Sequence, residues 1–324
     1  MIQLYVSHLS PYACKIMALM GYAAVPHEII VEDIWNRFAV LKKMTGKTMV
    51  PVLRHGDFAI NDSTRIAKHL LASSQRPLLP DERFLAWLVE DFCDEWIVRW
   101  FARARWALPQ NRRHMEKTIG AEMFGFPLRT LGGRVAAASI RASLEKSGTL
   151  TRYDGLENSR ERTLALLEDL FEHGLYLFGG HPSVADFALY GFLWQFGHDP
   201  ASQDAVRAFP NLWRYVQRVH AWSGAGGALD ATVRPTAELS PLIAEILGTY
   251  WRVLEANARM SRGQTTDVEL LDGTVLPVRS AGWYATCLNG LLDEAQSMHR
   301  TSGVYCLDPA LDAVIGAAID GVKA

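Results

Sequence analysis

The stretch LYVSHLSPYAC, Leu4–Cys14, sets an apolar run, a polar turn and a helix start next to one another. Its apolar beginning belongs to the run Ile2–Val6, which predicts a strand. The polar residues after it predict a turn, and Pro11 suits the first position of a helix because no backbone donor is lost there. A helix N-terminus directs unpaired N–H groups and a positive partial charge at its ligand. The turn therefore predicts a site for an anion or a thiolate.

The segments that follow alternate between strand and helix patterns as far as residue 76. Further strands are predicted at 26–31, 49–53 and 58–61, and helices at 11–21, 33–44 and 64–72. Together with the first strand, this order predicts a small mixed sheet covered by helices, which is the thioredoxin-like arrangement.

Pro51 stands inside the third predicted strand, MVPVL. Proline cannot donate to a strand ladder, so it must lie at an edge or a turn, and a cis Val50–Pro51 bond would be a natural solution. Such a bond would leave the backbone N–H and C=O of Val50 facing outward. These groups could then pair with a peptide-like ligand as an added strand.

The bulk properties are those of an ordinary soluble protein, with 49% hydrophobic and 21% charged residues. The formal net charge of -2 argues against nucleic acid or an anionic membrane as a partner. The four cysteines form no CxxC pair or zinc pattern, which favours free thiols in a reducing compartment and no bound metal. The sequence has no signal-peptide pattern and no apolar run of about 18 residues, so we expect a cytoplasmic protein.

The middle of the chain is mostly helical in pattern. An aromatic-rich helix is predicted over 81–108, and its stripe, which includes Trp96 and Trp100, suits a core, a subunit interface or the wall of an apolar pocket. Residues 109–133 hold charges, glycines and a proline, and predict a loop or short helices. Helices are predicted next at 134–146 and 159–172, then one ending at Phe196 and another at 213–221.

The last ninety or so residues predict a helix, a hairpin about Asp272-Gly273 and two more helices. The segments are 241–260, 267–279, 283–298 and 309–319. We therefore expect four parts: a thioredoxin-like domain, a linker, an all-helical substrate domain and an α+β extension, at 1–76, 77–82, 83–230 and 231–324. The extension is expected either to buttress the helical domain or to cover the cleft.

Three separated segments, LYVSHLSPYA, MVPVL and INDSTRIAKHL, resemble the N-terminal domain of the glutathione S-transferase superfamily. In the second half, HPSVADFAL resembles the capping box of the family's C-terminal domain, with Ser183 and Asp186 as structural residues. The resemblance covers about residues 1–225. It implies a thioredoxin-like domain followed by an all-α domain, and a homodimer.

The resemblance also assigns a glutathione site. Ser10 lies where serine-type members carry the hydroxyl that hydrogen-bonds the glutathione sulfur. Val50, with Pro51, would pair with the cysteinyl backbone, and Asp62 and Ser63 would hold the γ-glutamyl end.

Several alternatives stay open at these positions. Ser10 and Ser63 could each be no more than an N-cap, Ser7 is a rival for the sulfur contact, and His8 could help it. Cys14 could be a nucleophile, but its position one turn into the helix favours a packed thiol. Arg65 departs from the family pattern; it could reach the glutathione carboxylate or point to solvent.

The implied function is that of a glutathione transferase, in which Ser10 activates the glutathione thiolate for attack on a small apolar or aromatic electrophile, as in detoxification. Serine stands where a glutaredoxin-type CPYC has its nucleophilic cysteine, which weakens disulfide chemistry. Peroxide reduction and ether cleavage are variants of the same site. A protein that keeps the fold as a binding or scaffold module is the alternative from another class.

Overall fold

The computed structural model describes residues 1–224 and 226–323. The chain forms two compact units, each assembled from three separate stretches. Unit 1 comprises Met1–Leu78, Val98–Thr151 and Asp186–Ala228, and unit 2 comprises Leu79–Ile97, Arg152–Ala185 and Leu229–Ala324.

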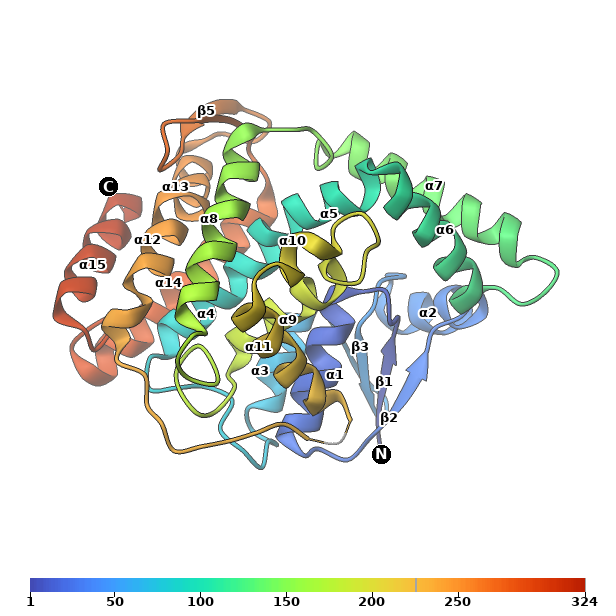
Figure 1. Ribbon diagram of the computed structural model, residues 1–324, viewed down its shortest axis with the longest axis horizontal. Helices are drawn as coiled ribbons and strands as arrows, with labels where there is room; N and C mark the ends of the chain where they lie inside the picture. The colour runs from blue at the N-terminus through green and yellow to red at the C-terminus, as the bar shows by residue number, and fades with distance from the viewer. Residues whose placement is uncertain (225, 324) are drawn as a thin grey trace. The chain divides into compact units, whose positions relative to one another are not determined.

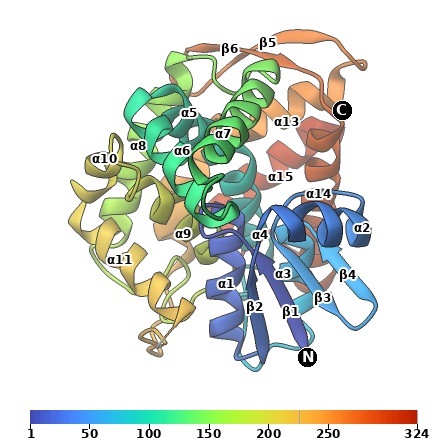
Figure 2. The same ribbon diagram turned by 90° about the vertical axis from the view of Figure 1, so that its right-hand side faces the viewer.

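Unit 1 begins with the predicted mixed sheet, in the strand order β2-β1-β3-β4 (Figure 2). Strand β1 runs parallel to β2 and antiparallel to β3, and β3 pairs antiparallel with β4. The strands are β1 (Ile2–Val6), β2 (His27–Val31), β3 (Val52–His55) and β4 (Phe58–Asn61), and the helical segments are α1 (Pro11–Ala23), η1 (Asn36–Leu41), α2 (Lys42–Thr45) and α3 (Ser63–Leu70). The thioredoxin-like prediction is confirmed.

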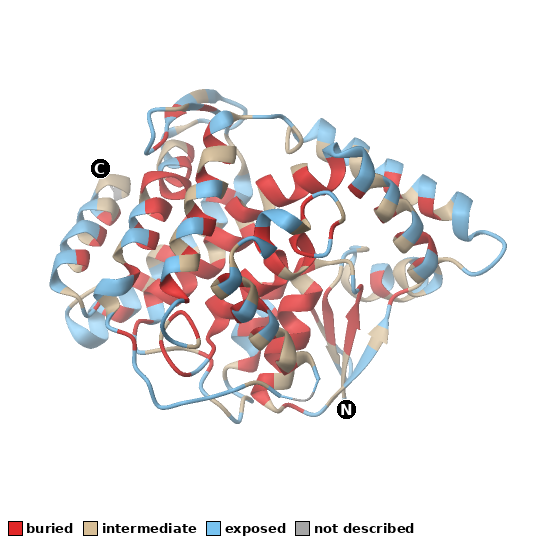
Figure 3. Cartoon of the chain, in the orientation of Figure 1, coloured by how far each residue is buried: buried red, intermediate tan, exposed pale blue. Residues whose placement is uncertain are grey.

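Helix α1 forms the buried centre of this half, as its red colour in Figure 3 shows. It ends at Ala24, which adopts the left-handed conformation with φ 53. The rest of unit 1 is helical: α5 (Val98–Ala107), α6 (Pro109–Met123), α7 (Arg129–Lys146), most of α9 (Val184–Phe196), α10 (Gln203–Arg207), α11 (Pro210–His220) and η3 (Ala221–Ser223).

The prediction of a loop or short helices over 109–133 is wrong. Residues 109–123 form the continuous helix α6, and α7 starts at Arg129, so the two helices run side by side as a hairpin (Figures 1 and 2). Charged residues and Pro127 suggested a loop, but the buried stripe Met115, Ile119, Met123 has the spacing of a helix face. This hairpin packs its apolar side on Trp106, and many of its charged residues are exposed.

Unit 2 contains the first part of the aromatic helix, α8 and the C-terminal extension. Its elements are α4 (Arg83–Phe92), η2 (Cys93–Ile97), α8 (Asp154–Leu170), η4 (Thr236–Leu239), α12 (Ser240–Gly248), α13 (Tyr250–Arg259), β5 (Thr265–Glu269), β6 (Val275–Arg279), α14 (Gly282–Ser302) and α15 (Pro309–Lys323). The hairpin about Asp272-Gly273 is confirmed, with Gly273 at φ 77.

The single helix predicted over 241–260 is two helices that break at Thr249. Leu271 explains the break, because its backbone N–H donates to the Gly248 carbonyl at 2.7 Å and its side chain packs where a Gly248 Cβ would lie. An intact helix would use that carbonyl internally.

The C-terminal extension packs on helices α4 and α8 of its own unit. α12 contacts α8 and α4, and α14 contacts α4. Phe92 and Trp96, both buried, lie with ring centroids 6.3 and 6.5 Å from that of Tyr250. These contacts support the buttress interpretation, and Trp96 of the aromatic stripe is a core residue.

Candidate functional site

Three sequence-predicted segments emerge at one end of the sheet. Tyr5 is paired with Val52, and Val52 with Asn61, so a single row of residues crosses β1, β3 and β4. The Ser7–Ser10 turn follows β1, Val50-Pro51 precedes β3, and Asp62-Ser63 follows β4. Asn61 Nδ2 also donates to the Met49 carbonyl at 2.8 Å, which ties two of these segments together. Strand register therefore brings the candidate residues to the same end of the sheet.

Ser10 is the N-cap of α1. Its Oγ accepts a hydrogen bond from the Ala13 N–H at 3.3 Å, so Ser10 does act as an N-cap. The cap uses only a lone pair, and the Ser10 hydroxyl proton has no acceptor among the described residues. A serine hydroxyl can accept and donate at the same time, so the cap leaves the Ser10 proton available to a ligand.

Ser7 and His8 are engaged by Glu122, which the sequence did not suggest. The carboxylate accepts hydrogen bonds from the Ser7 hydroxyl and from the His8 backbone N–H, the latter at 3.0 Å. The Ser7 Oγ in turn accepts from the Leu9 N–H at 3.2 Å. Because the one Ser7 proton is already used, Ser10 is the better candidate for a contact with sulfur.

The backbone of this turn is fixed by a buried network from the helical part of unit 1. Arg105, which is 3% exposed, makes a two-pronged ion pair with Asp199 at 2.7 and 2.8 Å and donates to the Leu9 carbonyl at 2.7 Å. Gln195 on α9 donates to the His8 carbonyl at 2.6 Å. Both turn carbonyls thus point into the protein and are satisfied there.

Helix α9 meets the start of α1 at close range. A Cβ on Gly191 would lie 2.3 Å from the Pro11 carbonyl oxygen, so only glycine allows this approach. Tyr12 and Phe192 pack edge to face beside it, with ring centroids 5.3 Å apart. This contact holds the N-terminus of α1 and brings Gln195 to the turn.

The Val50–Pro51 peptide bond is cis, as predicted. Pro51 is buried and Val50 is half-buried. Neither the N–H nor the C=O of Val50 has a hydrogen-bond partner within residues 1–224 and 226–323. Both backbone groups of Val50 are therefore available to pair with an extended peptide.

Asp62, and not Ser63, is the N-cap of α3. Its carboxylate accepts from the Arg65 N–H at 3.1 Å, and its φ of 106 is an uncommon conformation for a residue with a side chain. Backbone strain of this kind is concentrated at functional sites. Ser63 is buried as the first residue of α3 and accepts from the Lys15 ammonium at 3.5 Å, and Arg65 is exposed.

Cys14 is a packed thiol. It is 3% exposed, Gln195 Nε2 lies 3.1 Å from its Sγ, and burial raises its pKa to about 11. At neutral pH such a group is a thiol and a poor nucleophile, which agrees with the packed alternative.

The residues predicted to cap the central helix lie at its start. α9 begins at Val184, directly after Ser183, and both Ser183 and Asp186 are buried. Asp186 accepts a hydrogen bond from the Tyr215 hydroxyl of α11 at 3.1 Å. Asp186 therefore also joins α9 to α11, a contact that the sequence did not predict.

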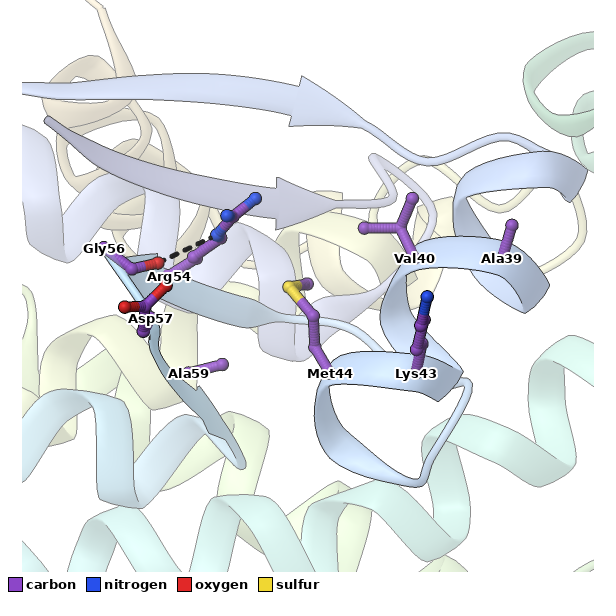
Figure 4. A pocket seen from close by; sticks show the side chains of 8 residues that line it. All are labelled: Ala39, Val40, Lys43, Met44, Arg54, Gly56, Asp57 and Ala59. Atoms are coloured by element: carbon purple, nitrogen blue, oxygen red, sulfur yellow. Dashed lines mark hydrogen bonds between the residues drawn. The ribbon is translucent and has the colours of Figure 1, made fainter.

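An open pocket of about 310 Å³ lies at the other end of the sheet, beside the β3–β4 turn (Figure 4). Lys43 and Met44 of α2 line it on one side, and Arg54 and Asp57 of the hairpin line it on the other. It contains none of the residues assigned to glutathione. The described part of the chain has no cluster of metal-ligating side chains and no helix that is long and apolar enough to cross a membrane.

Two family models match the chain. Residues 4–77 match the glutathione S-transferase N-terminal domain, and residues 151–218 match the glutathione S-transferase C-terminal domain. The chain therefore belongs to the glutathione S-transferase superfamily. No curated relative matches the sequence. The segment 108–150, which includes the α6–α7 hairpin, lies between the two matched regions.

Similar solved structures include glutathione S-transferases and a beta-etherase. A glutathione S-transferase from Rhodospirillum rubrum has 18% identity and a TM-score of 0.45, and the match covers 67% of this chain and 86% of that one. A beta-etherase from Sphingobium sp. has 18% identity and a TM-score of 0.46, with 68% and 95% covered. A glutathione S-transferase from Methylobacterium radiotolerans, in complex with glutathione sulfonate, has 19% identity and a TM-score of 0.43, with 72% and 99% covered.

Proposed function

We propose that this protein is a glutathione transferase in which Ser10 stabilises the glutathione thiolate. The convergence of the Ser10 turn, Val50-Pro51 and Asp62-Ser63 at one end of the sheet is the observation that carries the proposal. In it, the backbone groups of Val50 pair with the cysteinyl unit of glutathione. The N-terminus of α3 receives the γ-glutamyl carboxylate, and Asp62 receives the ammonium.

The available interactions have the right size for thiolate activation. Lowering the pKa of a thiol by two units takes about 2.7 kcal/mol of differential stabilisation. A hydrogen bond to a charged group contributes roughly 1.5–3 kcal/mol, and a helix N-terminus adds roughly 0.3–1 kcal/mol. The free Ser10 proton and the start of α1 supply one interaction of each kind.

The reaction then needs an electrophile held close to the sulfur. The thiolate attacks an electrophilic carbon of a small apolar or aromatic compound, a C–S bond forms, and the leaving group departs with its bonding electrons. We further expect a homodimer with a role in detoxification, because the protein resembles glutathione transferases. We also expect it to be cytoplasmic. Glutathione is the only co-substrate proposed, and no metal takes part.

Substitution of Ser10 tests the proposal. In Ser10→Ala, which removes the hydrogen bond but keeps the helix N-terminus, we expect the pKa of enzyme-bound glutathione to rise by roughly 1–2 units and kcat/KM for a conjugation substrate to fall roughly 10- to 100-fold. The ultraviolet absorbance of the thiolate during a pH titration measures the first, and steady-state kinetics the second. Ser10→Thr keeps both the cap and a hydroxyl, so it should recover most of the loss.

Three outcomes would count against this reading. Unchanged ionisation in Ser10→Ala would remove Ser10 from its role and return Ser7 to consideration. A wild-type protein that binds glutathione without conjugating, ether-cleaving or peroxidase activity would instead be a binding module. Absence of glutathione binding would overturn the proposal as a whole.

A further inference from the structure

We propose that His8, oriented by Glu122, is the base that takes the proton from the thiol of bound glutathione. The inference rests on the proposed function and adds a second catalytic group to it. Ser10 stabilises the thiolate by donating a hydrogen bond to the sulfur. In that role it is not the group that accepts the proton of the thiol. The proton must therefore pass to another side chain or to solvent, and a base beside the sulfur makes that transfer direct.

His8 stands on the same turn, two residues before Ser10, and its side chain is 58% exposed. Its Nδ1 lies 3.2 Å from a carboxylate oxygen of Glu122. An ionised carboxylate only accepts hydrogen bonds, so Nδ1 carries the hydrogen and Nε2 is left with a free lone pair. Among the described residues Nε2 has no hydrogen-bond partner, which leaves it open to a ligand.

Glu122 is held firmly enough to orient the ring. Its side chain is 11% exposed, the Ser7 hydroxyl donates to Oε1, and the His8 backbone N–H donates to Oε2. Gln195 fixes the His8 carbonyl from the other side at 2.6 Å. A histidine whose Nδ1–H meets a fixed carboxylate, with Nε2 turned to the substrate, is the arrangement that makes imidazole a general base.

The other charged groups near the turn are already paired. Arg105 of α5 binds Asp199, and Glu32, which follows β2, accepts two hydrogen bonds from Arg37 at 2.7 and 3.0 Å. Glu122 is therefore the charged group in direct contact with the ring. Its negative charge stabilises the imidazolium that forms when the proton arrives.

The proposed step is balanced without a further reactant. The S–H bond of glutathione breaks, its electron pair stays on sulfur, and the proton forms an N–H bond at Nε2 of His8. After the thiolate has attacked the electrophile, the imidazolium returns the proton to the leaving group or to water. Glu122 is a positioning residue in this scheme because it acts only through His8.

The test compares His8→Gln and Glu122→Gln with the control Glu116→Gln, which changes a half-buried carboxylate on the same helix. We expect His8→Gln to lower kcat/KM about 100-fold, with little change in KM for glutathione. The fraction of bound glutathione present as thiolate at neutral pH should fall with it. Glu122→Gln should lower the same two quantities about 10-fold, and Glu116→Gln should leave both unchanged.

Rescue of an alanine variant by added imidazole gives an independent test of His8 as the base. His8→Ala should lose about as much activity at neutral pH as His8→Gln, and should recover part of it when free imidazole is added, because the exposed position admits a small base. Loss of a merely structural side chain would show no such recovery.

The outcomes separate this inference from the proposed function. If the wild-type protein binds and ionises glutathione, but His8→Gln ionises it equally well, the role of His8 is overturned and that of Ser10 stands. If imidazole fails to rescue His8→Ala, the role of His8 as a base is also overturned. If wild-type protein does not bind glutathione, the proposed function itself fails.

Discussion

Cys14 illustrates how burial decides the chemistry of a residue next to the site. The sequence left it as either a nucleophile or a packed thiol. Its pKa is raised from 9.0 to about 11, chiefly because the thiolate would lose its hydration, and the Gln195 amide offsets only part of that effect. The neutral thiol is therefore the form that the fold favours at neutral pH.

This shift predicts a pH dependence of alkylation. In native protein, Cys14 should resist iodoacetamide at neutral pH, and labelling should increase only as the pH approaches 11. The sign follows from the raised pKa: the stabilisation of the neutral thiol is present at neutral pH and is lost as the pH rises through about 11. Peptide mapping by mass spectrometry identifies the residue, with urea-unfolded protein as the control. Rapid labelling of native Cys14 at neutral pH would contradict the prediction.

At Ser7 and Ser10 the sequence predicted candidates, and the contacts rank them. Both residues are serines on the same turn, so the sequence alone cannot tell which hydroxyl would contact the sulfur. The Ser7 hydroxyl already donates its hydrogen bond to Glu122, whereas Ser10 uses only a lone pair for its cap. Glu122 lies 115 positions from Ser7, so no local pattern around the turn could have indicated it.

At the scale of elements, the α6–α7 hairpin is the largest departure from the predicted structure. Its glycines resemble loop signals in the sequence, but they serve close packing of helices. A Cβ on Gly133 would lie 2.1 Å from the Glu116 carbonyl oxygen, and one on Gly120 would lie 2.3 Å from that of Arg129. The hairpin brings Glu122 to the first turn, so its geometry bears on the site.

Gly133→Ala should therefore destabilise the protein. Alanine is favoured over glycine in a helix by about 1 kcal/mol, but here the added Cβ meets backbone that cannot move without separating the helices. We expect a net loss of about 1–3 kcal/mol in the free energy of unfolding, measured by urea denaturation. The matched control is Gly290→Ala in α14, where a Cβ meets nothing within 4 Å.

The control should be neutral or more stable than wild type, by up to about 1 kcal/mol. Equal effects of the two substitutions would mean that close packing of α6 on α7 does not constrain the hairpin.

At the scale of the whole molecule, a network of charged residues joins the C-terminal extension to helix α8 within unit 2. Arg162 of α8 binds the buried Glu245 of α12 at 2.7 and 3.1 Å and Asp272 of the β5–β6 turn at 2.9 Å. Ser159 donates to Glu245 at 2.6 Å. The extension is thus attached through polar groups as well as through its apolar core.

Arg162→Ala should cost about 3 kcal/mol in the free energy of unfolding, because it leaves the 2% exposed Glu245 without its cation. Denaturant melts of both proteins measure this difference. Arg152→Ala removes an exposed partner of Asp154 and should change stability by less than about 1 kcal/mol. A loss for Arg162→Ala no larger than that of the control would show that the network does not hold the extension.

The sequence by itself determined the features that depend on neighbours along the chain. Short, mainly apolar segments predicted β1 and β4 with the bounds that the structure has, Pro11 marked the start of α1, and Pro51 indicated a cis bond. Periodicity and proline chemistry act over a few residues, so one segment is enough to reveal them.

Only the tertiary structure decided which side chains meet. Strand register brought the three candidate segments to one end of the sheet, and helix packing brought Glu122, Arg105 and Gln195 to the first turn. The sequence around a carboxylate or a guanidinium does not indicate which distant residue it will bind in the folded chain. The reason is physical: its hydrogen bonds depend on distance and direction in space, and those are set by packing over more than ninety positions of sequence.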